Sequence, residues 1–138
     1  MSGDYQIAWL IPQRVIYVRA WGRHDATTIR VYSAEARKFI EQGIAPVHML
    51  TDDRDVTMMP TLTTVQDALS FARDPNMGWI VTVGTKNRMI QMGSRLISRI
   101  FGVNYNRVET IEDAIAFLTN KDATLRWNDA DQSVLAEH

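Results

Sequence analysis

The pattern of apolar and polar positions predicts two strands at the start of the chain. The segments Tyr5–Leu10 and Val15–Trp21 are rich in β-branched and aromatic residues, which favour extended structure. Pro12 lies between them, where its fixed φ and missing N–H favour a turn. These features predict an antiparallel hairpin.

A helical pattern follows the hairpin. Apolar residues recur at helical spacing from Ala26 to Gln42, after Gly22 interrupts the strand pattern. Asp25 is the predicted N-cap, because its carboxylate can accept a hydrogen bond from the first turn, and Gly43 is the predicted stop. We therefore predict one helix of about four to five turns here.

The remaining chain alternates between strand and helix patterns. The predicted strands are Val47–Leu50, Trp79–Val83 and Tyr105–Val108, and the predicted helices are Leu62–Arg73, Arg88–Phe101 and Thr110–Leu118. The order β-β-α-β-α-β-α-β-α indicates an α/β fold with a mixed, mostly parallel sheet of about five strands, opened by the N-terminal hairpin. We expect a single domain over residues 1–119 and a polar, loosely docked tail over residues 120–138.

Composition excludes several classes of protein. The 138 residues include 15 Lys and Arg against 16 Asp and Glu, so the near-neutral chain has no global attraction to nucleic acid. The absence of cysteine excludes disulfides, thiolate metal sites and a cysteine nucleophile. No apolar run is long enough for a membrane span and no signal-peptide pattern is visible, so we expect a cytoplasmic protein.

Several segments together resemble a known family. The hairpin with RVIYVRAWG, the helix ending in IEQG, VHMLTDDRDV, WIVTVG and VETIEDAIAFL are similar in order and spacing to the STAS family, the anti-sigma-factor antagonist domain, in its divergent SpoIIAA-like branch. That branch is related in fold to the CRAL-TRIO lipid carriers. The resemblance implies a regulatory domain that binds a protein partner through the loop and helix after the third strand.

The regulatory mark of this family is altered in the present sequence. The resemblance implies an Asp-Ser pair whose serine a kinase phosphorylates, but the chain has Met59-Pro60-Thr61-Leu62-Thr63 at that place. Thr61 is a candidate phosphosite, and Thr63 is a second hydroxyl beside it. A plain N-cap threonine is a sufficient structural explanation of the position.

Two groups of residues are candidates for contact with a partner. Met58, Met59 and Phe71 are predicted to form an adaptable apolar surface, because Phe71 falls opposite the apolar side of its predicted helix. The alternative is a small satellite cluster packed inside the fold. A stripe on the next predicted helix offers either a solvated face or a recognition face for an acidic partner, and consists of Arg88, Met92, Arg95 and Arg99.

The carboxyl ends of the predicted strands are candidates for ligand binding, as in other open α/β sheets. Asp52 and Asp53 end the third strand, where they form either a ligand or phospho-acceptor site or an acidic turn partnered by Arg54. The turn after the fourth strand is either an anion site or a capped turn, and consists of Gly84, Thr85, Lys86 and Asn87. We predict no metal and no cofactor.

Catalytic motifs are missing from the sequence. His48 lies between apolar residues in a predicted strand, where a packed histidine is the ordinary case, and no nucleophile-elbow or zinc-ligand spacing occurs. We therefore predict a non-enzymatic, STAS-type regulatory module that binds a protein partner or a second copy of itself. The alternative is a small-molecule or lipid-binding domain that uses the turn at Gly84–Asn87.

Overall fold

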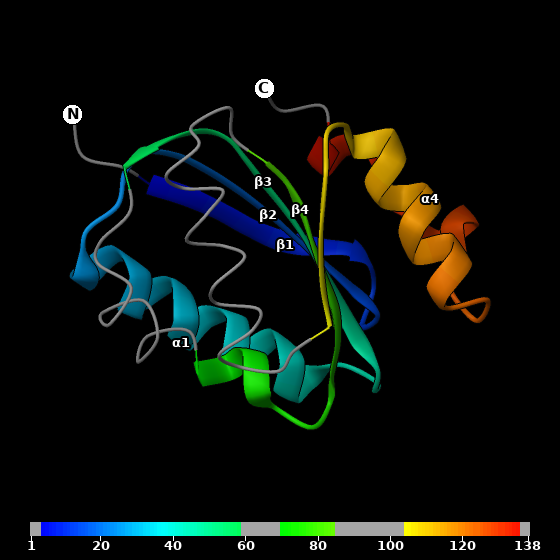
Figure 1. Ribbon diagram of the computed structural model, residues 1–138. Helices are drawn as coiled ribbons and strands as arrows, with labels where there is room; N and C mark the ends of the chain where they lie inside the picture. The colour runs from blue at the N-terminus through cyan, green and yellow to red at the C-terminus, as the bar shows by residue number, and fades with distance from the viewer. Residues whose placement is uncertain (1–3, 59–69, 85–103, 136–138) are drawn as a thin grey trace.

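The computed structural model describes residues 4–58, 70–84 and 104–135. Within these ranges a central sheet carries helix α1 on one face and helix α4 on the other (Figure 1). The strands are β1 (Asp4–Ile11), β2 (Val15–Arg23), β3 (Val47–Met58), β4 (Met77–Val83) and β5 (Tyr105–Val108). The helical elements are α1 (Ala26–Gln42), the 3₁₀ turn η1 (Ser70–Arg73), α4 (Ile111–Lys121), and the 3₁₀ turns η2 (Trp127–Asp129) and η3 (Gln132–Leu135).

The sheet has the order β1-β2-β3-β4-β5. Strands β1 and β2 pair antiparallel, and the other neighbours pair parallel. This arrangement confirms the predicted α/β class and the predicted opening hairpin. It leaves β1 at one edge of the sheet and β5 at the other (Figure 1).

The hairpin turn is held from outside by the end of α1. Gln13 has a φ of 64°, in the left-handed region that favours glycine. Its side-chain amide donates to the Gln42 carbonyl at 3.2 Å, and its own carbonyl accepts from the Ile44 N–H at 2.9 Å. These two bonds offset the cost of the backbone conformation and fix the hairpin against the helix.

Helix α1 begins and ends where the sequence predicts. The Asp25 carboxylate accepts the Thr28 N–H at 2.8 Å, which satisfies one of the free amides of the first turn. The Gly43 N–H donates to the Ile40 carbonyl at the other end. The helix buries Ile29, Ala36 and Ile40 against the sheet.

Strand β3 is much longer than predicted. It continues through the acidic run to Met58, whereas the sequence pattern predicted an end at Leu50. Two arginines explain the difference, because Arg54 pairs with Asp52 and Arg19 of β2 pairs with Asp55 at 3.0 Å. Arg54 on β3 itself and Arg19 on the neighbouring strand thus neutralise an acidic run whose composition alone predicts a turn.

The two faces of the sheet have separate cores. The α1 face buries Ile16, Val18, Ala36, Ile40, Val47, Met49 and Phe71. The α4 face buries Leu10, Ile11, Val15, Tyr17, Leu50, Val81, Val83, Ala114, Leu118 and Leu125. The presence of Leu125 in the second list shows that the chain after α4 contributes to the core.

The segment after α4 is docked, in contrast to the loosely docked tail that we expected. Leu125 is buried, and Trp127 and Val134 pack against the α4-face core. The Asp131 N–H also donates to the Leu10 carbonyl of β1 at 2.7 Å. A few widely spaced apolar residues are sufficient to dock this segment, because they pack against the α4-face core.

Two predicted helices lie mainly or wholly outside the described residues. Of the helix predicted over Leu62–Arg73, the structure describes the last turn, which is the 3₁₀ turn η1. The helix predicted over Arg88–Phe101 falls outside the described ranges.

Candidate functional site

A row of polar residues crosses the α1 face at the carboxyl ends of the parallel strands. The hydroxyl oxygens of Thr51 on β3 and Thr82 on β4 lie 2.8 Å apart, and both residues are buried. Thr82 is in register with Arg107 on β5, so three neighbouring strands each place a polar side chain at this level. Open α/β sheets bind ligands at this end of their strands.

Asp52 is neutralised within the protein. Its carboxylate is almost fully buried and accepts two bonds from the Arg54 guanidinium, at 2.9 and 2.8 Å. The Arg54 backbone N–H donates to the same carboxylate at 3.2 Å, and the Tyr17 hydroxyl lies 3.5 Å away. A bidentate pair of this kind fixes both side chains and leaves Asp52 a poor metal or phosphate acceptor.

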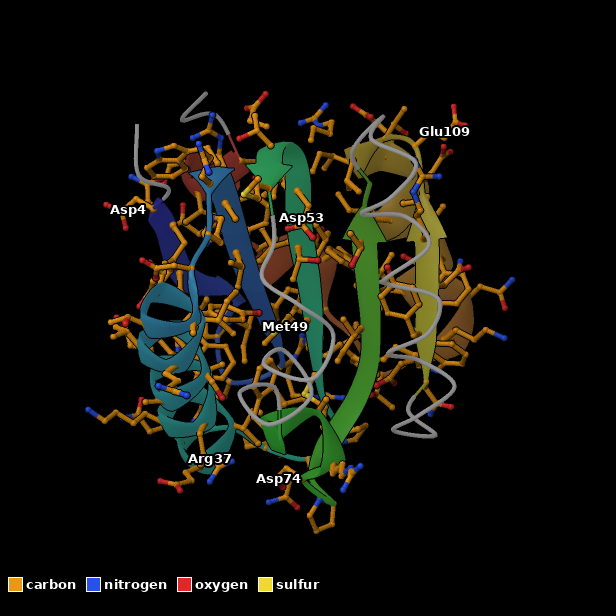
Figure 2. The ribbon with its side chains drawn as sticks, turned by 60° about the vertical axis from the view of Figure 1, so that its left-hand side comes forward. Asp4, Arg37, Met49, Asp53, Asp74 and Glu109 are labelled. Carbon is orange, nitrogen blue, oxygen red and sulfur yellow. The ribbon has the colours of Figure 1, made fainter. Side chains whose placement is uncertain are left out.

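Asp53, unlike Asp52, lies in surroundings that disfavour the charged form of its carboxyl group. Burial, with a smaller contribution from the Asp52 carboxylate, raises the pKa of Asp53 to about 7. Asp53 contributes, after burial, to raising the pKa of the Tyr32 phenol on α1, which is consistent with its place on the α1 face, above Met49 along β3 (Figure 2). A carboxyl that titrates near neutrality is a common property of functional sites.

Gly84 ends β4 beneath an arginine side chain. A Cβ at this position would overlap the Cδ and guanidinium of Arg107, so a glycine is needed for the side chain to cross the strand. The Gly84 N–H donates to the Val108 carbonyl at 3.1 Å. This amide is therefore committed to the sheet rather than pointed at a bound anion.

Met58 presents an exposed apolar side chain on a fixed backbone. The residue ends β3, and its side chain is 48% exposed. The His24 N–H donates to its carbonyl at 2.9 Å, and the Arg23 guanidinium lies 3.3 Å from its sulfur. The position matches the predicted start of the partner surface.

Phe71 does not match that surface, and the prediction that it is exposed was wrong. The residue is 3% exposed and belongs to the α1-face core. Its ring meets the Tyr32 ring edge-on, with centroids 5.6 Å apart. The chain forms a 3₁₀ turn here, so the helical spacing that placed Phe71 on the outside does not apply.

The other predicted contact residues fall outside the described parts of the chain. For the partner surface, these are Met59, Thr61, Thr63, Arg88, Met92, Arg95 and Arg99, and for the ligand turn, Thr85, Lys86 and Asn87.

A polar cluster that the sequence did not predict lies at the amino ends of the strands. The Asp122 carboxylate, just after α4, accepts the His48 Nε2–H and the Arg14 guanidinium, both at 2.8 Å. The Thr124 N–H and hydroxyl donate to its other oxygen. Burial alone would raise the pKa of Asp122, but the hydrogen bonds from Thr124 and His48 and the Arg14 charge outweigh it and lower the pKa to about 2. We call Asp122, His48, Arg14 and Thr124 the Asp122 latch.

The Asp122 latch resembles the acid–histidine part of a catalytic triad but differs at the reactive nitrogen. His48 Nδ1 accepts the Trp79 backbone N–H at 2.9 Å, so the ring hydrogen must lie on Nε2 and point at Asp122. A Cβ at Gly78 would overlap the ring, which shows how closely β4 covers it. Because both nitrogens are occupied, His48 has no free nitrogen for a nucleophile or substrate.

The described residues also bear on metal binding and on membrane insertion. No group of three or more His, Cys, Asp or Glu side chains is arranged there to hold a metal ion. Across the same ranges, no helix combines the length and the apolar character that crossing a membrane requires.

Comparison with known proteins supports the fold. No protein-family model matches the sequence, and no curated protein matches it at a significant level. Among solved structures, the chain is similar to an uncharacterized protein of the DUF3478 family with a SpoIIAA-like fold from Shewanella loihica PV-4. The match has a TM-score of 0.62 at 13% identity, and covers 84% of this chain and 94% of that protein. The chain therefore has a SpoIIAA-like fold, as the sequence resemblance implied.

Proposed function

We propose that this protein is a non-enzymatic regulatory module of the STAS type that binds a protein partner at the carboxyl end of β3. The observation that carries the proposal is Met58, whose side chain is about half exposed while its backbone is bonded to His24. A methionine on a rigid backbone can adapt to a partner with little loss of backbone entropy. The SpoIIAA-like fold supports a binding role, and the occupied nitrogens of His48 fit a structural rather than a catalytic histidine.

The partner surface extends from Met58 into the segment that follows it. Met59, Thr61 and Thr63 belong to the proposed surface by their position in the sequence, and Thr61 is its proposed phosphosite. The proposal replaces Phe71 with Met58 as the apolar anchor, because Phe71 is buried. The arginine stripe from Arg88 to Arg99 is a proposed second contact for an acidic partner.

A substitution at Met58 tests this placement. We expect the purified full-length protein, immobilised and exposed to extract of its own cells, to retain a protein partner that Met58→Glu loses, because a buried carboxylate is costly at an apolar contact. Ile44→Glu is the matched control, since Ile44 is 57% exposed but precedes β3 at its opposite end. Cross-linking and mass spectrometry should place the contact beside residue 58. Equal retention by both variants would contradict the placement.

A small-molecule or lipid-binding role is the second candidate. The observation in its favour is that Asp53 of β3, whose pKa is raised to about 7, and Gly84 at the end of β4, which the Arg107 side chain crosses, lie toward the carboxyl ends of adjacent strands. Native mass spectrometry of the same preparation separates the two roles. A co-purifying small molecule favours ligand binding, and a mass equal to the chain alone favours the interaction module.

A further inference from the structure

The free edge of the sheet is a surface that the proposed function does not use. Strand β1 pairs with β2 on one side and is an edge strand on the other. Within residues 4–58, 70–84 and 104–135, the outer side of β1 is bonded where the Asp131 N–H donates to the Leu10 carbonyl and where the Tyr5 N–H donates to the carboxylate of its neighbour Asp4, at 2.8 Å. Figure 2 shows Asp4 at the outer margin of the molecule, where this edge begins.

The hydrogen-bond pattern of β2 shows which groups of β1 point outward. The Arg14 carbonyl points toward β3, because it accepts the His48 N–H. The backbone N–H and C=O groups of successive residues point to alternate sides of a strand, so those of Tyr17 and Arg19 point toward β1. Tyr17 lies opposite Ala8, and Arg19 lies opposite Gln6. Ala8 and Gln6 therefore face inward.

It follows that the N–H and C=O groups of Tyr5, Ile7 and Trp9 face outward. The open stretch ends where Asp131 bonds Leu10, and Ile7 lies at its centre. An open groove of about 650 Å³ runs along it, with Val31 and Glu35 of α1 on its wall. A strand placed in this groove would continue the sheet.

The side of α1 next to the groove carries charges that would complement those of a second copy related by a two-fold axis. At 100° per residue, Val31, Glu35, Lys38 and Gln42 follow one another along the β1 side of α1. The Tyr5 hydroxyl donates to Glu35 at 2.6 Å, and the Trp9 and Phe39 rings lie 5.2 Å apart, so Ile7 is level with the helix between residues 35 and 39. A two-fold axis at Ile7 thus brings Glu35 of each copy beside Lys38 of the other.

We infer that two copies of this chain pair antiparallel through β1 and form one continuous ten-stranded sheet from two five-stranded sheets. The axis passes near Ile7, with Tyr5 of one copy opposite Trp9 of the other. About six backbone hydrogen bonds form across the axis. Val31, which is 52% exposed in the single chain, is covered by α1 of the second copy.

Sedimentation velocity of the full chain and charge variants tests the inference. We expect a monomer–dimer equilibrium in the wild type and a dimer about tenfold weaker in Lys38→Glu, because Glu35 then faces a second carboxylate in each of two symmetric contacts. The double variant Glu35→Lys with Lys38→Glu should restore much of the affinity. Arg30→Glu, an exposed change about a quarter turn around α1 from Lys38 and away from β1, is the matched control and should leave the dimer unchanged.

A single cysteine tests the position of the axis. The natural chain has no cysteine, so Ile7→Cys introduces one thiol per copy next to the proposed axis. Mild oxidation should yield a disulfide-linked dimer from Ile7→Cys and none from Glu112→Cys, whose residue is exposed on α4. Circular dichroism checks that each variant is folded. A wild type that stays monomeric at high concentration, a dimer that Lys38→Glu does not weaken, or a folded Ile7→Cys dimer that does not cross-link would overturn the inference.

Discussion

Two aspartates, Asp122 beside the start of β3 and Asp53 farther along the same strand, differ in which charge state the fold stabilises. Asp122, at the amino ends of the parallel strands, has a pKa of about 2, whereas Asp53, near their carboxyl ends, has a pKa of about 7. Burial raises the pKa in both places. The difference is that donors from His48 and Arg14 stabilise the Asp122 carboxylate, while a second carboxylate lies beside Asp53.

The comparison separates a structural site from a candidate functional one. At the Asp122 latch, each donor is matched by an acceptor, so the cluster stabilises the fold. At Asp53, burial and the Asp52 carboxylate disfavour the charged carboxylate, so ionisation of Asp53 destabilises the folded protein. A bound hydrogen-bond donor or cation would reduce that destabilisation. The three predictions that follow test this contrast.

The largest effect is expected from Asp122→Ala. Removing the carboxylate leaves His48 and Arg14 without their shared acceptor in a poorly exposed place, so the free energy of unfolding should fall by about 3 kcal/mol. Urea titration measures the change. Asp129→Ala is the control, because Asp129 and Arg126 form an exposed pair at 4.0 Å that should contribute less than about 0.5 kcal/mol. Similar losses in both variants would show that the latch contributes no more than a surface pair.

A smaller effect of opposite sign is expected from Asp53→Asn. The pKa of this carboxyl is about 7 in the folded protein and about 3.8 in the unfolded chain, so wild-type stability should fall as the pH rises between these values. The amide variant removes that slope and should be more stable than wild type by about 2 kcal/mol at pH 8. Thermal unfolding across this pH range measures both quantities. Glu41→Gln, an exposed change on α1, should keep the wild-type slope, and a slope that survives Asp53→Asn would assign it to another group.

The smallest effect concerns the hydroxyl pair beside Asp53. Thr51→Val leaves the buried Thr82 hydroxyl without its 2.8 Å partner and should reduce stability by about 1 kcal/mol. The double variant Thr51→Val with Thr82→Val removes both polar groups while keeping their shape, so its stability should return close to that of the wild type. The double-mutant cycle by urea titration measures the coupling. Additive losses would mean that the two hydroxyls do not act as a pair.

The sequence predicts the features that depend on neighbours along the chain. The hairpin around Pro12 and the cap at Asp25 were predicted from local patterns, and the structure confirms both. The residues that identify each feature are adjacent or a few positions apart, although Gln42 and Ile44 also hold the hairpin turn from a distance. Local physical chemistry is therefore sufficient to identify them.

Other features depend on partners that are distant in the sequence. The end of β3 was placed too early because the acidic run from Asp52 to Asp55 has the composition of a turn. Arg19, which pairs with Asp55, is 36 positions away and comes beside it only when β2 and β3 pair. His48 was predicted to be packed, but its bond to Asp122 was not predicted. The two residues are 74 positions apart, and no local spacing in the sequence indicates that they meet. Phe71 was misplaced because a helical period was applied across a 3₁₀ turn.

The span of the Asp122 latch has a consequence for the rates of folding and unfolding. Its bonds join Asp122 to His48 across 74 positions and to Arg14 across 108, so closing them means closing long loops of chain. We expect the latch to close late in folding, because it can form only after the strands that carry Arg14 and His48 lie side by side. The latch should then slow unfolding. A variant that lacks it should unfold faster, and its folding rate should be nearly that of the wild type.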